Sequence, residues 1–328
     1  MKLAAFVRRI ALGLLAALMI PLMAQAQAWP TRQPIKFIVP YPPGGASDVT
    51  ARILGVKLSE SLGQAVVIED RGGANGIIAL EYFAKSAPDG YTILMGNLGP
   101  NAINPAVYKK LPYDPIKDFA PITLTSVVPQ IVVVAPSLPI KSVQELIAYA
   151  KANRGKVSFA SGGNGAPNHL AGELFNAMAG IKMAHIPYRG DTPSLTDVMS
   201  GAIAVAFPTA IAAMPNVKSG RLRAIAVTSA KRIPSLPDVP TVSESGLPGF
   251  ESVSWGGVMA PAGTPPEIIN RLNTEINRIL KLPDVIEKLS ALGAEVVGTT
   301  PDEFAAYLKA EIAKWGKVAR DNDVIAPR

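Results

Sequence analysis

Short runs of β-branched and apolar residues alternate along the chain with segments whose apolar residues recur at helical spacing. In the N-terminal third, the short runs predict three strands, Ile35–Val39, Val66–Glu69 and Tyr91–Met95. Between them, Val49–Leu62 and Ile77–Lys85 have the periodicity of amphipathic helices. Strands that alternate with helices predict a parallel sheet with right-handed crossovers.

A second set of strands follows a proline-rich connection at Leu111–Pro121. These strands are predicted at Ile131–Ala135, Val157–Ala160, Ala184–Pro187, Ile203–Phe207 and Ala224–Thr228. Ser142 and Glu145 form a capping box, which predicts a helix start between the first two of them. The chain therefore contains a second α/β unit.

The C-terminal part has long amphipathic helices and too little strand for a third sheet domain. Thr264–Glu267 and Thr300–Glu303 are typical helix-capping sequences, and Val296–Val297 offers only a short strand. The simplest arrangement folds this part back onto the first unit, so that the chain crosses between the units near Thr123–Ile131 and near Phe250–Met259. Two extended crossings form a hinge, and a hinge between two lobes forms a cleft.

The N-terminus has the pattern of a secretory signal peptide. Basic residues precede an apolar run, Ile10–Met23, which is followed by small residues. Because this run is too short to span a bilayer, a signal peptide over residues 1–28 is preferred to an uncleaved membrane anchor. We expect cleavage after Ala26 or Ala28.

The composition argues against several classes of function. The chain has no cysteine, which excludes disulfides, thiolate metal sites and thiol nucleophiles. Its formal net charge of +7 is dispersed, without a long basic run, and does not favour nucleic-acid binding. The two histidines lack the spacing of a zinc site, so neither a metal nor another cofactor is expected.

Glycine-rich segments with small polar side chains follow four of the predicted strands. They are Pro42–Asp48, Gly96–Asn101, Ser161–His169 and Tyr188–Thr192. A strand that enters a helix through glycines leaves backbone N–H groups unpaired at the positive end of the helix dipole, which favours anions. Ligands of open α/β sheets bind beyond the carboxyl ends of the strands. Two facing lobes of this kind could grip a dicarboxylate, although glycine-rich turns are also common in α/β folds that bind nothing there.

Other functions of these segments have less support. Gly44–Val49 is not the G-x-G-x-x-G sequence of dinucleotide-binding proteins, and Ser161 lacks the G-x-S-x-G sequence of hydrolases. Arg189 could clamp a carboxylate or extend into solvent, and His169 could donate to a carboxylate or cap its own loop. We expect Asp191 to brace its loop, because its charge would repel an anionic ligand.

Several longer motifs resemble one known family. They are Val39–Asp48, Val67–Gly76, Pro88–Thr92, Ala160–Leu170, His185–Gly190, Val239–Gly246 and Ala260–Pro265. Together they are similar to the Bug-type, TctC-like receptors of tripartite tricarboxylate transporters, over essentially the whole mature chain. The resemblance implies an α/β, type II-like periplasmic-binding-protein fold, with two lobes of mostly parallel sheet flanked by helices and a ligand cleft at the hinge. The expected boundaries are residues 29–126 plus 254–328 for lobe 1 and 127–253 for lobe 2.

The resemblance also implies a function. It implies a periplasmic receptor and not an enzyme. Such a receptor binds a dicarboxylate, a tricarboxylate or an aromatic acid and delivers it to the membrane permease of a tripartite tricarboxylate-type transporter. A monomer suits this role. In the family, the first strand–helix loop, here Pro43 to Ser47, holds one ligand carboxylate, and loops of the second lobe complete the cage. The candidate ligand-binding residues are therefore Tyr41, Pro43, Gly44, Gly45, Ala46, Ser47, Asn97, Ser161, Gly163, Asn164, Gly165, Asn168, His169, Tyr188, Arg189, Gly190, Asp191 and Thr192. An exported enzyme acting on a carboxylate, or a ligand-sensing partner of a membrane sensor kinase, are the alternatives.

One difference from the family pattern concerns the far end of the ligand. The family often has an acidic residue after the strand that matches Ile203–Phe207, whereas this chain has Pro208 and Thr209 there. Because that acid can meet a ligand amine, its absence favours ligands other than amino acids.

Overall fold

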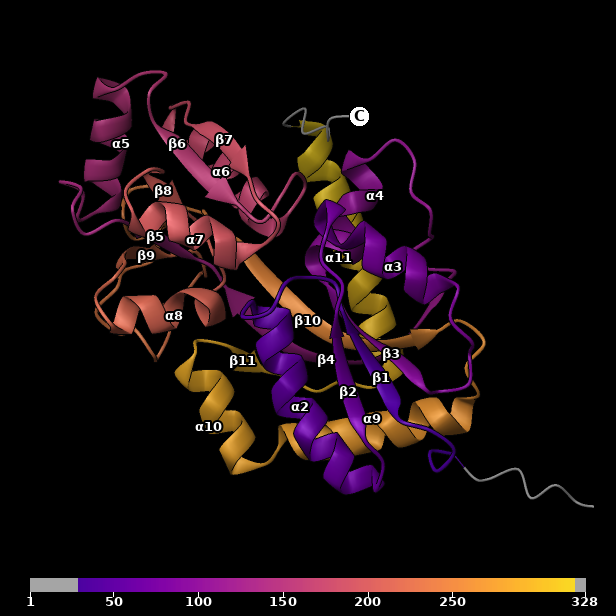
Figure 1. Cartoon of the computed structure of the whole chain (residues 1–328). Coiled ribbons are helices and arrows are strands. Elements are labelled where there is room, and N and C mark those ends of the chain that lie inside the picture. The colour runs from indigo at the N-terminus through magenta and orange to yellow at the C-terminus, as the bar shows by residue number, and fades with distance from the viewer. Residues whose placement is uncertain (1–28, 322–328) are drawn as a thin grey trace, which may run out of the picture.

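The protein is built from two sheets flanked by helices, as the computed structural model shows (Figure 1). The structure describes residues 29–321, so the predicted signal peptide and its cleavage sites lie outside the described residues. Below, lobe 1 means the first sheet with its helices and lobe 2 the second sheet with its helices. Each helix within residues 29–321 is too short or too polar to cross a bilayer.

The sheet of lobe 1 has six strands in the order β11-β4-β10-β3-β1-β2. They are β1 (Ile35–Val39), β2 (Val66–Asp70), β3 (Thr92–Asn97), β4 (Phe119–Pro129), β10 (Val253–Pro261) and β11 (Glu295–Val296). β1 is parallel to both its neighbours, whereas β10 is antiparallel to β3 and β4. The helices of this lobe are α2 (Ala46–Leu62), η1 (Ala74–Gly76), α3 (Ile77–Ala84), η2 (Gly99–Ile103), α4 (Asn104–Val107), α9 (Pro266–Leu280), α10 (Pro283–Ala291) and α11 (Pro301–Asp321).

The sheet of lobe 2 has five strands in the order β7-β6-β8-β5-β9. They are β5 (Ile131–Val134), β6 (Ser158–Ser161), β7 (Ala184–Pro187), β8 (Val205–Ala206) and β9 (Arg223–Val227), and the helices are α5 (Val143–Ala152), α6 (Pro167–Ala179), α7 (Asp191–Met199) and α8 (Ala210–Lys218). Only β5 runs antiparallel to its neighbours. The predicted fold class, α/β with two sheets flanked by helices, is confirmed, and both sheets are mixed, with antiparallel pairings beside the parallel ones.

The two segments expected as crossings between the lobes are also long strands. β4 and β10 pair antiparallel along their whole length, and only Gln130 separates β4 from β5. The prolines of β4 had indicated a connection, because proline cannot donate to a ladder. Pro121 is tolerated because, on the side away from β10, β4 pairs with β11 only at Ser126 and Val127.

Two of the three helix caps that the sequence predicted are present in the structure. The backbone N–H of Glu145 donates to Ser142 Oγ at 3.1 Å, and that of Glu303 donates to Thr300 Oγ1 at 3.2 Å, as the capping boxes predicted. The expected cap at Thr264 is wrong, because α9 begins after Pro265 and the Thr264 hydroxyl donates to Pro261 O at 2.7 Å.

A buried carboxylate joins α11 to the sheet of lobe 1. Glu311 Oε2 accepts hydrogen bonds from Trp255 Nε1 of β10 at 3.2 Å and from Trp315 Nε1 at 3.0 Å. Both indoles are among the most completely buried side chains in residues 29–321. One carboxylate therefore satisfies two donors that have no access to water.

Replacing Glu311 should destabilise lobe 1. We expect Glu311→Ala to lower the free energy of unfolding by roughly 2–4 kcal/mol, because two buried indole N–H groups lose their acceptor. Glu311→Gln should cost less, since its amide oxygen still accepts. Urea denaturation measures both, with Glu287→Ala on the exposed face of α10 as the control. A loss for Glu311→Ala no larger than for the control contradicts this role.

Candidate functional site

A cavity of about 50 Å³ lies between the two lobes, where the segments after several strands meet. It is lined by Tyr41, Pro42, Gly45, Ala46, Ser47 and Asn97 of lobe 1, by Gly162, Ala166, Pro167, Asn168, Gly190, Asp191, Thr192 and Thr209 of lobe 2, and by Gln130 and Ser254 on the two crossing segments. We call this the central cavity. Both lobes and both crossings contribute to it.

Four helices begin at the central cavity. The N-cap residues of α2, α6, α7 and α8 are Gly45, Ala166, Gly190 and Thr209, and all of them line it. None of these helices has a side-chain hydrogen bond capping its N-terminus. Their first N–H groups and dipoles therefore create a positive potential that favours an anion in the cavity.

Neutral polar side chains complete the wall. Asn97 Nδ2 donates to Ser47 Oγ at 3.3 Å and to Trp255 O at 3.2 Å, which fixes both lining side chains. Gln130 is fully buried, and its Nε2 has no hydrogen-bond partner among the described residues. Since a buried amide donor without a partner is costly, a ligand acceptor at this position would stabilise the site.

The lobes touch around the cavity. Thr192 Oγ1 of lobe 2 donates to Pro43 O of lobe 1 at 3.1 Å, and Tyr108 OH of lobe 1 lies 3.3 Å from Asn164 O of lobe 2 and donates to it. A Cβ added at Gly165 would lie 2.7 Å from Val107 Cγ2. The structure therefore shows the lobes closed, and glycine at this position permits the contact.

Asp191 is the one charged side chain lining the central cavity within residues 29–321. Its Oδ1 accepts from Asn168 Nδ2 at 2.6 Å, and its Oδ2 accepts from Thr209 N at 3.2 Å and Thr209 Oγ1 at 3.0 Å. Burial raises the pKa of this carboxyl, while the bonds from Thr209 and Asn168 lower it less. Asp191 braces loops after two strands, as expected, and also faces the cavity.

The predicted ligand-binding residues divide into two groups. Those that line the central cavity are Tyr41, Gly45, Ala46, Ser47, Asn97, Asn168, Gly190, Asp191 and Thr192. Those that do not line it are Pro43, Gly44, Ser161, Gly163, Asn164, Gly165, His169, Tyr188 and Arg189. Of the second group, Gly163, Asn164, Tyr188 and Arg189 line a neighbouring cavity of about 170 Å³, which shares Tyr41 and Gly162 with the central one. As ligand contacts, all these residues stay predictions.

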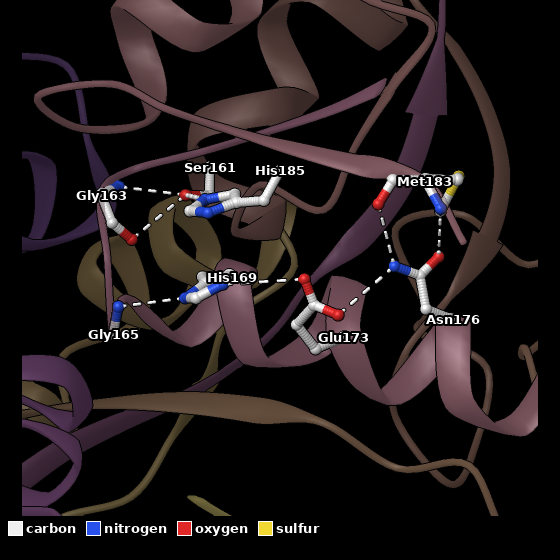
Figure 2. A network of polar contacts seen from close by, with 8 residues as sticks. All are labelled: Ser161, Gly163, Gly165, His169, Glu173, Asn176, Met183 and His185. Carbon is white, nitrogen blue, oxygen red and sulfur yellow. Dashed lines mark hydrogen bonds and ion pairs between the residues drawn. The ribbon is translucent and has the colours of Figure 1, made fainter. Parts of the chain in front are cut away.

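Two stacked histidines support the loop between β6 and α6 (Figure 2). The rings of His169 and His185 lie 3.7 Å apart, and His185 Nε2 lies 2.5 Å from Ser161 Oγ. The backbone N–H of Gly165 donates to His169 Nδ1 at 3.1 Å. His169 thus caps its own loop, one of the two roles that the sequence left open, and holds the chain that brings Ala166 and Asn168 to the cavity.

Sequence reasoning missed seven residues that line the cavity, namely Pro42, Gln130, Gly162, Ala166, Pro167, Thr209 and Ser254. Four of them lie inside the glycine-rich segments already singled out, so the signal for them was present. Gln130 and Ser254 lie on the crossing segments, and a search of those segments for polar side chains could have found them. No group of three or more potential metal-ligating side chains occurs in the described part of the chain.

Comparisons with known proteins agree with this architecture. Residues 50–324 match the sequence model of the tripartite tricarboxylate transporter family receptor. The chain is 40% identical over 297 residues to protein BugT of Bordetella pertussis, covering 90% of this chain and 91% of BugT. An R. palustris protein solved with adipate matches with a TM-score of 0.89 at 39% identity, over 91% of this chain and 100% of that protein. MatC of Rhodopseudomonas palustris with bound malate matches with a TM-score of 0.83 at 32% identity, over 88% and 99%.

Acid should destabilise the protein through the stacked histidines. Burial lowers the pKa of His169 to about 4, and burial together with the His169 charge lowers that of His185 to about 3. Since the unfolded value is about 6.5, the neutral pair stabilises the fold above about pH 6.5 and loses this contribution as the pH falls towards 4 and 3. Urea unfolding between pH 7.5 and 4 should therefore show a smaller decline for His185→Gln than for the unaltered protein, by at most about 1.4 kcal/mol per pH unit. Parallel declines contradict the assignment.

Proposed function

Because the chain belongs to the tripartite tricarboxylate transporter receptor family, we propose that it is a periplasmic receptor that binds a small carboxylate between its lobes. The observation that carries the proposal is the convergence of four helix N-termini on one cavity that lacks a cationic side chain within residues 29–321. Such a site favours an anion through backbone dipoles and N–H groups.

The available interactions are sufficient for useful affinity. Each helix terminus contributes roughly 0.3–1 kcal/mol to an anion, and more when partly buried. Hydrogen bonds to a charged group contribute about 1.5–3 kcal/mol each, and the Ser47 hydroxyl and the Gln130 amide can donate them. Micromolar binding needs about 8 kcal/mol, which a few of these interactions supply together.

The relatives support a carboxylate ligand. The two R. palustris proteins were solved with adipate and with malate, and both are acids with two carboxyl groups. A dicarboxylate suits the central cavity because lobe 1 and lobe 2 each contribute helix N-termini. One carboxylate would lie against Gly45–Ser47, the part of the first loop that lines the cavity.

Binding would work by closure of the hinge. We assign residues 29–126 plus 254–328 to lobe 1 and 127–253 to lobe 2, joined at the crossings. A ligand that contacts both lobes shifts the population towards the closed state, in which Thr192 meets Pro43. The membrane permease of a tripartite transporter would then recognise the closed receptor, which acts as a monomer after export and removal of residues 1–28.

A catalytic role has less support than binding. The pair Ser161 and His185 is the arrangement in this lobe that comes closest to a nucleophile and its base. Ser161 is fully buried and does not line the central cavity. A substrate held in the cavity would therefore not meet its hydroxyl.

Thermal unfolding in the presence of acids tests the proposal. The chain beginning at Trp29, unfolded and refolded to remove bound ligand, should show a saturable rise in Tm with a dicarboxylate, tricarboxylate or aromatic acid. Free ligand at about 100 times Kd should add roughly 2.7 kcal/mol to the stability. Methyl esters of the same acids are the control and should give no shift. Shifts with NAD or a metal and none with any acid contradict the proposal.

A single methyl group should hinder closure. Gly165 has φ +74° and a Cβ there meets Val107 of the other lobe, whereas Gly155 has φ +76° and open space. Both Gly→Ala variants carry similar backbone strain, so only Gly165→Ala should weaken acid binding, by roughly tenfold, which is about 1.4 kcal/mol. Calorimetric titration with the acid identified above measures this. Equal affinities of the two variants would show that the contact is unimportant for binding.

A further inference from the structure

The central cavity combines a general preference for anions with one fixed negative charge. Apart from Asp191, the residues that line it within 29–321 are neutral. A ligand carboxylate next to Asp191 would face a like charge at close range in a partly desolvated site, which is unfavourable. Any acid that binds here must therefore place some other group against this side chain.

The Asp191 carboxylate cannot move away from the cavity without losing its own partners. Its two oxygens accept three hydrogen bonds, one from Asn168 and two from Thr209. An ionised carboxylate offers about four acceptor positions, so one position on Oδ1 stays open. No lysine or arginine pairs with Asp191 among the described residues, and its position as the first residue of α7 gives it only partial compensation from the helix dipole.

The charge of Asp191 is consequently undercompensated. Burial raises its pKa, as expected for a carboxylate that lacks a cationic partner. Burial and, after it, the charge of Asp191 raise the pKa of Tyr41, another lining residue, whose hydroxyl donates to Asn75 at 2.8 Å and not to Asp191. Among the described residues, no fourth donor lies within hydrogen-bond distance of Asp191, so one acceptor position stays open on a side chain that lines the cavity.

We propose that Asp191 determines ligand specificity by accepting a hydrogen bond from a hydroxyl or ammonium group of the bound acid. The ligand class is then hydroxy- or amino-substituted dicarboxylic acids, with a carboxylate towards Gly45–Ser47 of lobe 1 and the donor towards Asp191 of lobe 2. This inference rests on the proposed receptor function and narrows it. Unsubstituted dicarboxylates bind less tightly, because they leave Asp191 without a donor and bring a second carboxylate near it.

This assignment revises the expectation drawn from Thr209. The absence of an acid at that position argued against a ligand amine. In the structure, however, the Asp191 carboxylate accepts two hydrogen bonds from Thr209 and lies beside it. The carboxylate of Asp191, at the start of α7, thus lies next to Thr209, the position where the sequence alone showed a neutral residue.

Matched acids test the inference directly on the unaltered protein. Succinate, malate and aspartate share one carbon skeleton and differ by hydrogen, hydroxyl or ammonium at one carbon; glutarate, 2-hydroxyglutarate and glutamate form a second series. Calorimetric titration at pH 7.5 should give at least tenfold tighter binding of a substituted acid than of the unsubstituted acid in the series that binds. Preference for the hydroxy or the amino acid identifies the donor. Binding of these acids without such a preference overturns this inference alone, whereas no binding by any carboxylic acid overturns the receptor function as well.

The variant Asp191→Asn separates recognition from structural damage. Asparagine keeps the size of the side chain and removes its charge, so the substituted acid should bind about tenfold more weakly and the unsubstituted acid should bind more tightly. Asp238→Asn, at an exposed position of lobe 2 outside the cavity, should bind both as before. An equal loss for both acids in Asp191→Asn overturns the inference. If the variant does not fold, the preference of the unaltered protein still decides.

Discussion

The antiparallel pairing of β4 with β10 is the constraint on which the rest of the structure depends. Both strands are part of the sheet of lobe 1, and both continue directly into the connections to lobe 2. Thr228 ties the two connections together, because its hydroxyl accepts from Gln130 N at 2.8 Å and donates to Ser252 O at 2.5 Å. The two chain connections between the sheets therefore lie side by side, and this is where we propose the hinge. The same pairing brings Gln130 and Ser254 into one wall.

In the proposed receptor, anion recognition would depend on the backbone more than on side-chain charge. Helix ends are held by the sheets from which they start, so their dipoles point at the cavity before a ligand arrives and cost no further ordering. A lysine or arginine would provide a stronger but less directed attraction, and would hold the ligand when the lobes open. Dipoles supplied by two lobes act together only while the lobes are closed. In the proposed receptor, this arrangement would couple strong binding to the closed conformation and release to the open one.

The elements and the site could be predicted from the sequence to different extents. Short β-branched runs and glycine clusters predicted the short parallel strands and the loops that follow them, because each of these signals lies within a few neighbouring residues. β4 was missed because its prolines argue against a strand unless the partner on each side is known. Asp191 and Thr209 lie eighteen residues apart, and β7 and β8 must be in place before their contact can be recognised. His169 lies on α6 and His185 on β7, and only the arrangement of the sheet brings their rings together. The spacing of the two residues in the sequence does not reveal this contact. The lobe boundaries and the ligand contacts stay predictions.

The return of the chain to its first sheet has a consequence for the order in which the protein can assemble. The strands of lobe 2 are contiguous in sequence, so that sheet can form as soon as β9 is available. In lobe 1, β3 lacks its second neighbour until β10 has been made, because β10 follows the whole of lobe 2 in the sequence. Pairings between such distant segments form slowly. In a chain that emerges from its N-terminus, the wall of the cleft is thus completed only when β10 has emerged, after the whole of lobe 2.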